Sequence, residues 1–168
     1  CGTRLDSADL ELMNRVEPYI QQRIEQHKNR GDAPELLLYI PVKFYLIRKS
    51  DGSGGSNVDV FSLLSGLNSR FGGTGFYFQQ CGAVEDIPSD NFYDFDVTEV
   101  QSLHNTAYTP NVLNMYIADR VTKGNKTMAG FSYMPAQGLW DIILIDYDEV
   151  AKSTVPHEVG HYFGLFHT

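Results

Sequence analysis

Apolar residues near the start of the chain follow the spacing of one face of an amphipathic helix. Between residues 7 and 29 they recur three or four positions apart, at Leu10, Met13, Val16, Ile20 and Ile24. Pro18 lacks a backbone donor, so we expect the helix to kink there or to restart with Pro18 in its first turn. The sequence therefore predicts a helix or helix pair that ends at the Gly-Asp-Ala-Pro stretch of residues 31–34.

The next apolar stretch has the composition of a β-strand. Residues 36–48 are rich in β-branched and aromatic side chains, and from Val42 onward only Lys43 interrupts the hydrophobic run before Arg48. A strand that is buried on both faces has this pattern. We therefore expect residues 36–48 to form a central strand of a sheet.

A Gly- and Ser-rich loop at residues 50–56 separates this strand from a second predicted helix. Asn57 is a candidate N-cap, and Asp59 is favourably placed for the first turn. The inward face of this helix is apolar, at Val60, Leu63, Leu64, Leu67 and Phe71. The glycines of residues 72–75 end the helix, and residues 76–80 follow as a short strand.

The second half of the chain is expected to supply the remaining strands. Residues 81–110 have no sustained period, which indicates a long irregular connection with short elements whose positions are left open. A further connection over residues 147–156 leads to a helix that opens after Pro156. Strands are predicted at residues 112–118, 128–134 and 141–146. This order of elements favours an α/β fold with a mixed sheet.

Composition excludes several classes of function. The chain of 168 residues, 42% of them hydrophobic, has the size of one domain with a core. Its net charge is −8 and its Lys and Arg residues are scattered, so we expect no nucleic-acid partner. No apolar stretch approaches the roughly 20 residues of a membrane span. Cys1 and Cys81 are the two cysteines, and whether they form a bridge stays open.

The last twelve residues, HEVGHYFGLFHT, carry the candidate chemistry. His157 and His161 are four positions apart, so on a helix their side chains lie on one face and can share a metal ion. Glu158 is rotated by about 100° around the helix axis and can act as a general base on a water bound there. His167 can supply the third protein ligand of a catalytic zinc site. Gly164 tolerates the left-handed backbone needed to turn His167 back toward the metal.

Chance spacing is the competing explanation for these residues. A bare HExxH arises in helices by accident, whereas the extended HExxHxxGxxH is much more specific. Three of the five histidines lie within residues 157–167, while His27 and His104 are expected to be solvated surface residues. One class of zinc protease, the gluzincins, takes its third zinc ligand from a distant glutamate rather than from a nearby histidine. The role of His167 as third ligand therefore requires a test.

HExxHxxGxxH is the metzincin signature, and HEVGHYFGLFHT resembles the pappalysin branch of these zinc metalloproteases. The resemblance extends to a first core strand at residues 40–47, a helix-to-strand step at 67–78 and an edge strand at 129–135. It implies that residues 36–168 form a metzincin-like upper subdomain, a twisted mixed sheet with helices that ends in the active-site helix. Residues 1–35 would then be an N-terminal helical segment and a candidate for the end of a pro-segment.

The resemblance implies a zinc-dependent endopeptidase that acts on proteins or peptides. Metzincins continue past the third histidine to a methionine-containing turn and a lower subdomain, but none of the four methionines here follows the motif. We therefore expect the lower subdomain to lie outside this chain, and an inactive zinc-binding fragment or latent pro-form is the alternative. Calcium is expected by family resemblance only.

Cys1 begins a Cys-Gly-Thr segment that resembles one found ahead of the catalytic domain in several pappalysin-like sequences. The cysteine there can bind the zinc and keep the zymogen latent, since a thiolate is a strong zinc ligand. Two alternatives stay open: a lipidated first residue of a bacterial lipoprotein, and an inert residue at a cut in the sequence. A start without methionine indicates that an upstream part was removed or left out, whether a signal segment, a pro-segment or a part beyond a cut in the sequence. Removal of a signal segment points to export, and we expect a secreted or cell-surface protein.

Overall fold

The computed structural model describes residues 37–55, 57–133, 141–165 and 167, together with ten positions between residues 7 and 25. These ten positions are all helical and exposed, in agreement with the helix predicted there. Leu10 is the described member of the predicted apolar face, and it is 52% exposed. Among the described residues, no helix has the length and apolar character that crossing a membrane requires.

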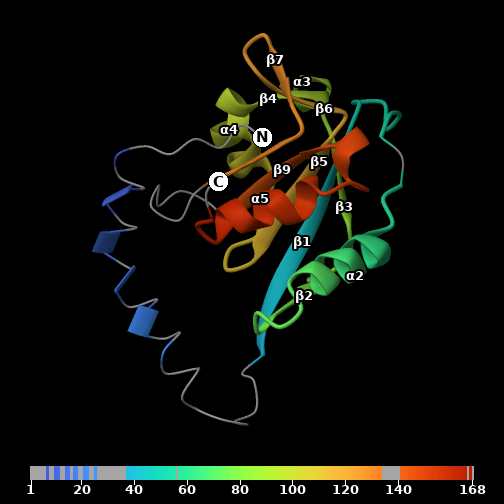
Figure 1. Ribbon diagram of the computed structural model, residues 1–168. Coiled ribbons are helices and arrows are strands. Elements are labelled where there is room, and N and C mark those ends of the chain that lie inside the picture. The colour runs from blue at the N-terminus through green and yellow to red at the C-terminus, as the bar shows by residue number, and fades with distance from the viewer. Residues whose placement is uncertain are drawn as a thin grey trace.

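A six-stranded sheet forms the centre of the described fold (Figure 1). Its strands are β1 (Leu38–Arg48), β2 (Phe76–Gln80), β3 (Glu85–Pro88), β5 (Leu113–Ala118), β8 (Gly130–Ser132) and β9 (Ile142–Asp146). The order is β2-β1-β5-β9-β8, and β3 pairs with β1 further along than β2. All neighbours run parallel except β8, which is antiparallel to β9 at the sheet edge. The expected mixed sheet is confirmed.

The prediction of a central strand is also confirmed. β1 has β2 and β3 on one side and β5 on the other. Phe44 and Tyr45, which point to opposite faces of the sheet, are at most 2% exposed. Strands predicted at residues 76–80, 112–118 and 141–146 are present as β2, β5 and β9.

Two helices cover one face of the sheet, α2 (Val60–Arg70) and α5 (Thr154–Tyr162), as Figure 1 shows. Val60 and Leu67 of α2 share a core cluster with Val155 and Val159 of α5 and with the inward side chains of the sheet. The apolar face predicted for α2 is therefore the face that packs. Because α5 lies on the sheet through Val155 and Val159, its other sides are available to carry polar groups.

The opposite face of the sheet has a second core cluster. It is covered by α3 (Asp90–Tyr93), α4 (Val100–Thr106) and a three-stranded sheet of order β4-β6-β7. The strands of this small sheet are β4 (Asp94–Asp96), β6 (Arg120–Lys123) and β7 (Lys126–Met128). Phe92, Phe95 and Leu103 belong to this cluster together with Tyr45 and Tyr116 of the large sheet.

Two predicted helix starts are wrong. The N-cap of α2 is Asp59, whose carboxylate accepts from the backbone N–H of Ser62 at 3.1 Å. Asn57 instead accepts a hydrogen bond from the Arg48 guanidinium at 3.3 Å. α5 begins at Thr154 rather than after Pro156, and the proline lies in the first turn, where a backbone N–H has no partner within the helix.

The long connection predicted at residues 81–110 contains regular elements, and one predicted strand is divided between two strands. Residues 81–110 contain β3, α3, β4 and α4, because the two strands pair with β1 and β6, which are distant in sequence. The strand predicted at residues 128–134 is divided between β7, which ends at Met128, and β8, which begins at Gly130 and joins the large sheet. Residue 134 lies outside the described residues.

Candidate metal centre

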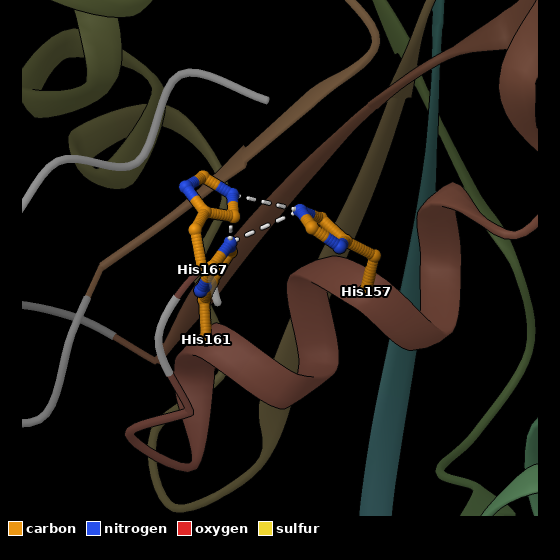
Figure 2. Close-up of side chains that lie close together, drawn as sticks. All are labelled: His157, His161 and His167. Carbon is orange, nitrogen blue, oxygen red and sulfur yellow. Dashed lines mark hydrogen bonds between the residues drawn. The ribbon is translucent and has the colours of Figure 1, made fainter.

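Three histidine side chains meet at one point beside α5 (Figure 2). His157 and His161 project from α5, and His167 reaches them from the segment that follows the helix. The Nε2 atom of His157 is 3.1 Å from that of His161 and 3.2 Å from that of His167. The third side of the triangle, between His161 and His167, is 3.0 Å. Within the described part of the chain, this is a group of side chains that could hold a metal ion.

The size of this nitrogen triangle suits a zinc ion. Tetrahedral zinc with Zn–N bonds of about 2.05 Å holds its nitrogen ligands about 3.3 Å apart. The observed separations of 3.0–3.2 Å are close to that value. Imidazole nitrogen is a preferred zinc ligand, and three protein ligands leave one position of the tetrahedron open. The donor set and its geometry therefore fit zinc.

A backbone hydrogen bond sets the orientation of His161. Its Nδ1 lies 2.6 Å from the carbonyl oxygen of Leu165. A carbonyl can only accept, so Nδ1 carries the proton and donates, and the lone pair of Nε2 faces the other two histidines. Metal-binding histidines in proteins are oriented by partners of this kind.

Burial favours the neutral, metal-binding form of two of the rings. His161 is 4% exposed, and this burial lowers its pKa below the ordinary value, against a smaller opposite effect of the bond to Leu165. The surface of His157 is exposed, but neighbouring groups remove part of the water around its ring, and this partial desolvation lowers its pKa, followed by repulsion from the charged forms of His161 and His167. Proton competition for a metal is reduced as a result.

A Schellman motif at the end of α5 places the Leu165 carbonyl. The backbone N–H of Gly164 donates to the His161 carbonyl at 2.8 Å, and that of Leu165 donates to the Gly160 carbonyl at 2.9 Å. Gly164 has φ +87°, in the left-handed region that favours glycine. The turn reverses the direction of the chain. As a result, the Leu165 carbonyl contacts His161, and the His167 side chain lies next to α5.

Glu158 lies on the buried side of α5, toward β8. Its exposed fraction is 0%, whereas His157 beside it is exposed. A Cβ built on Gly130 of β8 would be only 2.8 Å from Cγ of Glu158, so the strand and the glutamate are in close contact. The carboxylate is not one of the ligand atoms of the histidine cluster.

An acidic side chain ties the end of α5 to the sheet. The carboxylate of Asp141, just before β9, accepts from the hydroxyl of Tyr162 at 2.6 Å and from that of Tyr108 at 3.3 Å. Its backbone carbonyl accepts from the N–H of Asn114 at 2.7 Å. Burial raises the pKa of Tyr162, so its hydroxyl remains a donor. Because Tyr162 directly follows His161, this contact holds the part of the helix that carries the histidine.

The structure thus brings His157, His161 and His167 together, with Glu158 at the adjoining helix position and Gly164 in the turn. Cys1 lies outside the described residues, so the expectation that it binds zinc or carries a lipid stays a prediction. No second group of potential metal ligands occurs among the residues that the structure describes, and the calcium expectation has no support there.

Three features of the site were missed by reasoning from the sequence. Leu165 contributes a backbone oxygen, which no side-chain pattern reveals. Asp141 meets Tyr162 only because β9 packs against α5. Gly130 could have been found, since a glycine within a predicted strand often marks a close approach of another element.

Comparison with known proteins finds a relative in sequence and a neighbour in fold. An extracellular metalloprotease from Pyricularia oryzae is 26% identical in an alignment 128 residues long, and the match covers 67% of this chain and 44% of that protein. A solved structure of a promirolysin mutant from Tannerella forsythia aligns with a TM-score of 0.57 and 19% identity, over 96% of this chain and 67% of that chain. The chain has a metzincin-like fold. No protein-family model matches it.

The expected fold class is therefore confirmed, since promirolysin is a pappalysin-type metzincin. The likeness at 19% identity concerns the fold alone, and it does not assign roles to individual residues. The chain spans less than half of the Pyricularia oryzae relative, at 44% of its length. Activity and substrates of the whole protein are accordingly matters for proposal.

Proposed function

We propose that this metzincin-like chain provides the zinc-binding part of the active site of a pappalysin-type endopeptidase. The observation that carries the proposal is the triangle of His157, His161 and His167 nitrogens, with sides of 3.0–3.2 Å, beside α5. The metalloprotease relative and the fold of promirolysin support it. The proposed substrates are proteins or peptides, and the extracellular relative favours secretion or a place at the cell surface.

The three histidines are the proposed zinc ligands. Bound zinc would supply a Lewis acid that polarises the scissile carbonyl and makes water acidic enough to be deprotonated near neutral pH. The chain contributes the ligand orientation: the Leu165 carbonyl holds the His161 ring, and the turn at Gly164 delivers His167. A preformed triangle of this kind lowers the cost of ordering the ligands when zinc binds.

Glu158 is the proposed general base. Its carboxylate takes a proton from the water that attacks the peptide carbonyl, and it later gives this proton to the nitrogen of the leaving amine. The water oxygen ends in the new carboxyl group, and the peptide C–N bond breaks. Burial of Glu158 between α5 and β8 restricts its motion, which keeps the base in one place relative to the histidines.

A zinc-binding fragment or latent pro-form without activity is the second candidate. The chain covers 44% of the metalloprotease relative and 67% of promirolysin, and this candidate holds that cleavage requires residues other than these. The three proposed zinc ligands, in contrast, all belong to this chain. The two properties must therefore be measured separately.

Zinc binding is tested on the chain itself by metal analysis and by competition with a chelator. We expect one zinc per chain, loss of tight binding in His161→Ala and in His167→Ala, and no change in the control His104→Ala. Retention of zinc with unchanged affinity in His167→Ala would instead point to a distant glutamate as the third ligand.

Cleavage is tested on the full-length protein with an unfolded protein substrate. We expect Glu158→Gln to bind zinc normally and to lower kcat by about 100-fold or more, in line with the usual contribution of a general base. A chelator should abolish cleavage, and added zinc should restore it. Wild-type rates in Glu158→Gln, or in metal-free protein, would exclude this mechanism.

A further inference from the structure

The edge strand β8 and the helix α5 approach each other closely at a glycine. Gly130 is the first residue of β8 and pairs with Ile145 of β9. A Cβ built on Gly130 would lie 2.8 Å from Cγ of Glu158 and 3.1 Å from Cγ2 of Thr154. Both of these atoms belong to α5, so a side chain at position 130 would push against the helix.

Space, rather than backbone conformation, requires glycine at this position. Gly130 is not among the residues with positive φ, so alanine could adopt its backbone angles. The neighbours, however, have little freedom to move. The third atom near the built Cβ is the carbonyl oxygen of Leu144, at 3.0 Å, which is part of the sheet backbone. Glu158 itself is 0% exposed and cannot swing into solvent without leaving its site.

We infer that Gly130 is a positioning residue for Glu158, because its missing side chain provides the space in which the Glu158 side chain lies between β8 and α5. This inference rests on the proposed role of Glu158 as the general base. The zinc ligands should be affected much less. The end of α5 that carries His161 is held separately, by the turn at Gly164 and by the bond from Tyr162 to Asp141.

The variant Gly130→Ala tests this inference, with Gly66→Ala as the matched control. Gly66 lies in α2, and nothing is within 4 Å of a Cβ built there. In the full-length protein we expect Gly130→Ala to lower kcat by about 10- to 100-fold, the usual range for misplacing a catalytic group by up to 1 Å. KM and zinc affinity should stay within about threefold of wild type, because neither depends on the base. Gly66→Ala should leave all three unchanged.

A double-mutant cycle tests the same contact without relying on cleavage. Glu158→Ala removes the Cγ atom that the new methyl group would meet. Gly130→Ala should therefore lower the thermal unfolding midpoint clearly in the wild-type background and by less than about half as much in the Glu158→Ala background. If Gly130→Ala fails to fold alone but folds when combined with Glu158→Ala, the inference is equally supported.

Three results would overturn the inference: equal midpoint shifts in both backgrounds, loss of zinc together with activity in Gly130→Ala, or a wild-type kcat in that variant. Failure of both single and combined variants to fold would also count against it, since the strain would then not involve Glu158. A protein that binds no zinc but shows the coupling would refute the proposed function while leaving the contact between Gly130 and Glu158 established.

Discussion

Replacing Gly164 by alanine tests whether the turn after α5 builds the metal site. Gly164 has φ +87°, and a left-handed backbone costs an L-residue about 1–2 kcal/mol. The turn has two consequences for the site. It allows His161 Nδ1 to donate to the Leu165 carbonyl at 2.6 Å, and it brings Nε2 of His167 to within 3.0 Å of Nε2 of His161. The proposed zinc site requires both.

The size of the effect follows from this strain. In the Gly164→Ala variant the metal-free protein can relax by opening the turn, because the ligands do not yet have to converge. Zinc binding must then re-form the strained turn and supply the free energy of about 1–2 kcal/mol. We therefore expect zinc affinity to fall by about 5- to 30-fold. Gly164→Asn should lose less, since asparagine tolerates left-handed backbone better than alanine.

The assay is a competition titration against a chelating dye at neutral pH, combined with denaturant unfolding of the metal-free protein. Gly124→Ala is the matched control. Gly124 has φ +59° in the turn between β6 and β7, and nothing is within 4 Å of a Cβ built there. This control carries similar strain away from the histidines, so it should lower the unfolding free energy by about 1–2 kcal/mol without changing zinc affinity.

Wild-type zinc affinity in Gly164→Ala would refute the reasoning, because the turn would then not be needed to bring His167 to the site. Equal losses of affinity in Gly164→Ala and Gly124→Ala would also contradict it. The effect would in that case reflect the stability of the whole fold rather than the geometry of this turn.

Two further substitutions test contacts near the site and in α2. Tyr162→Phe removes the hydroxyl that donates to the Asp141 carboxylate at 2.6 Å, and we expect denaturant unfolding to show that the free energy of unfolding falls by about 1.5–3 kcal/mol. An unchanged free energy of unfolding would mean that the bond does not anchor α5. Asp59→Ala removes the N-cap of α2 and should lower the free energy of unfolding, measured by thermal unfolding, by about 1 kcal/mol, which is more than Asn57→Ala should. A larger loss in Asn57→Ala would instead support Asn57 as the N-cap, as the sequence predicted.

The elements that were predicted well are those whose own composition determines them. Residues 76–80 were expected as a strand and form β2 (Phe76–Gln80), and the apolar face of α2 was identified from its spacing. Prediction failed where the structure of a segment depends on a partner that is remote in sequence. β4 is a strand because it pairs with β6, and its sequence alone does not reveal that partner. Likewise, Asn57 and Asp59 are both good caps, and Arg48 engages the side chain of Asn57.

For the candidate site, the sequence by itself determined the chemistry that the end of the chain can offer. Helix periodicity places His157 and His161 on one side of α5 and turns Glu158 away from them, and this follows from spacing alone. Gly164 likewise indicated a turn after the helix.

Only the tertiary structure decided how this chemistry is assembled. The three nitrogens converge to 3.0–3.2 Å because the chain reverses after α5. The Leu165 carbonyl reaches His161 for the same reason, and Glu158 is confined because α5 packs against β8 at Gly130. These contacts depend on the direction of the chain beyond the helix and on packing between residues remote in sequence, which local patterns of hydrophobic and polar residues do not encode.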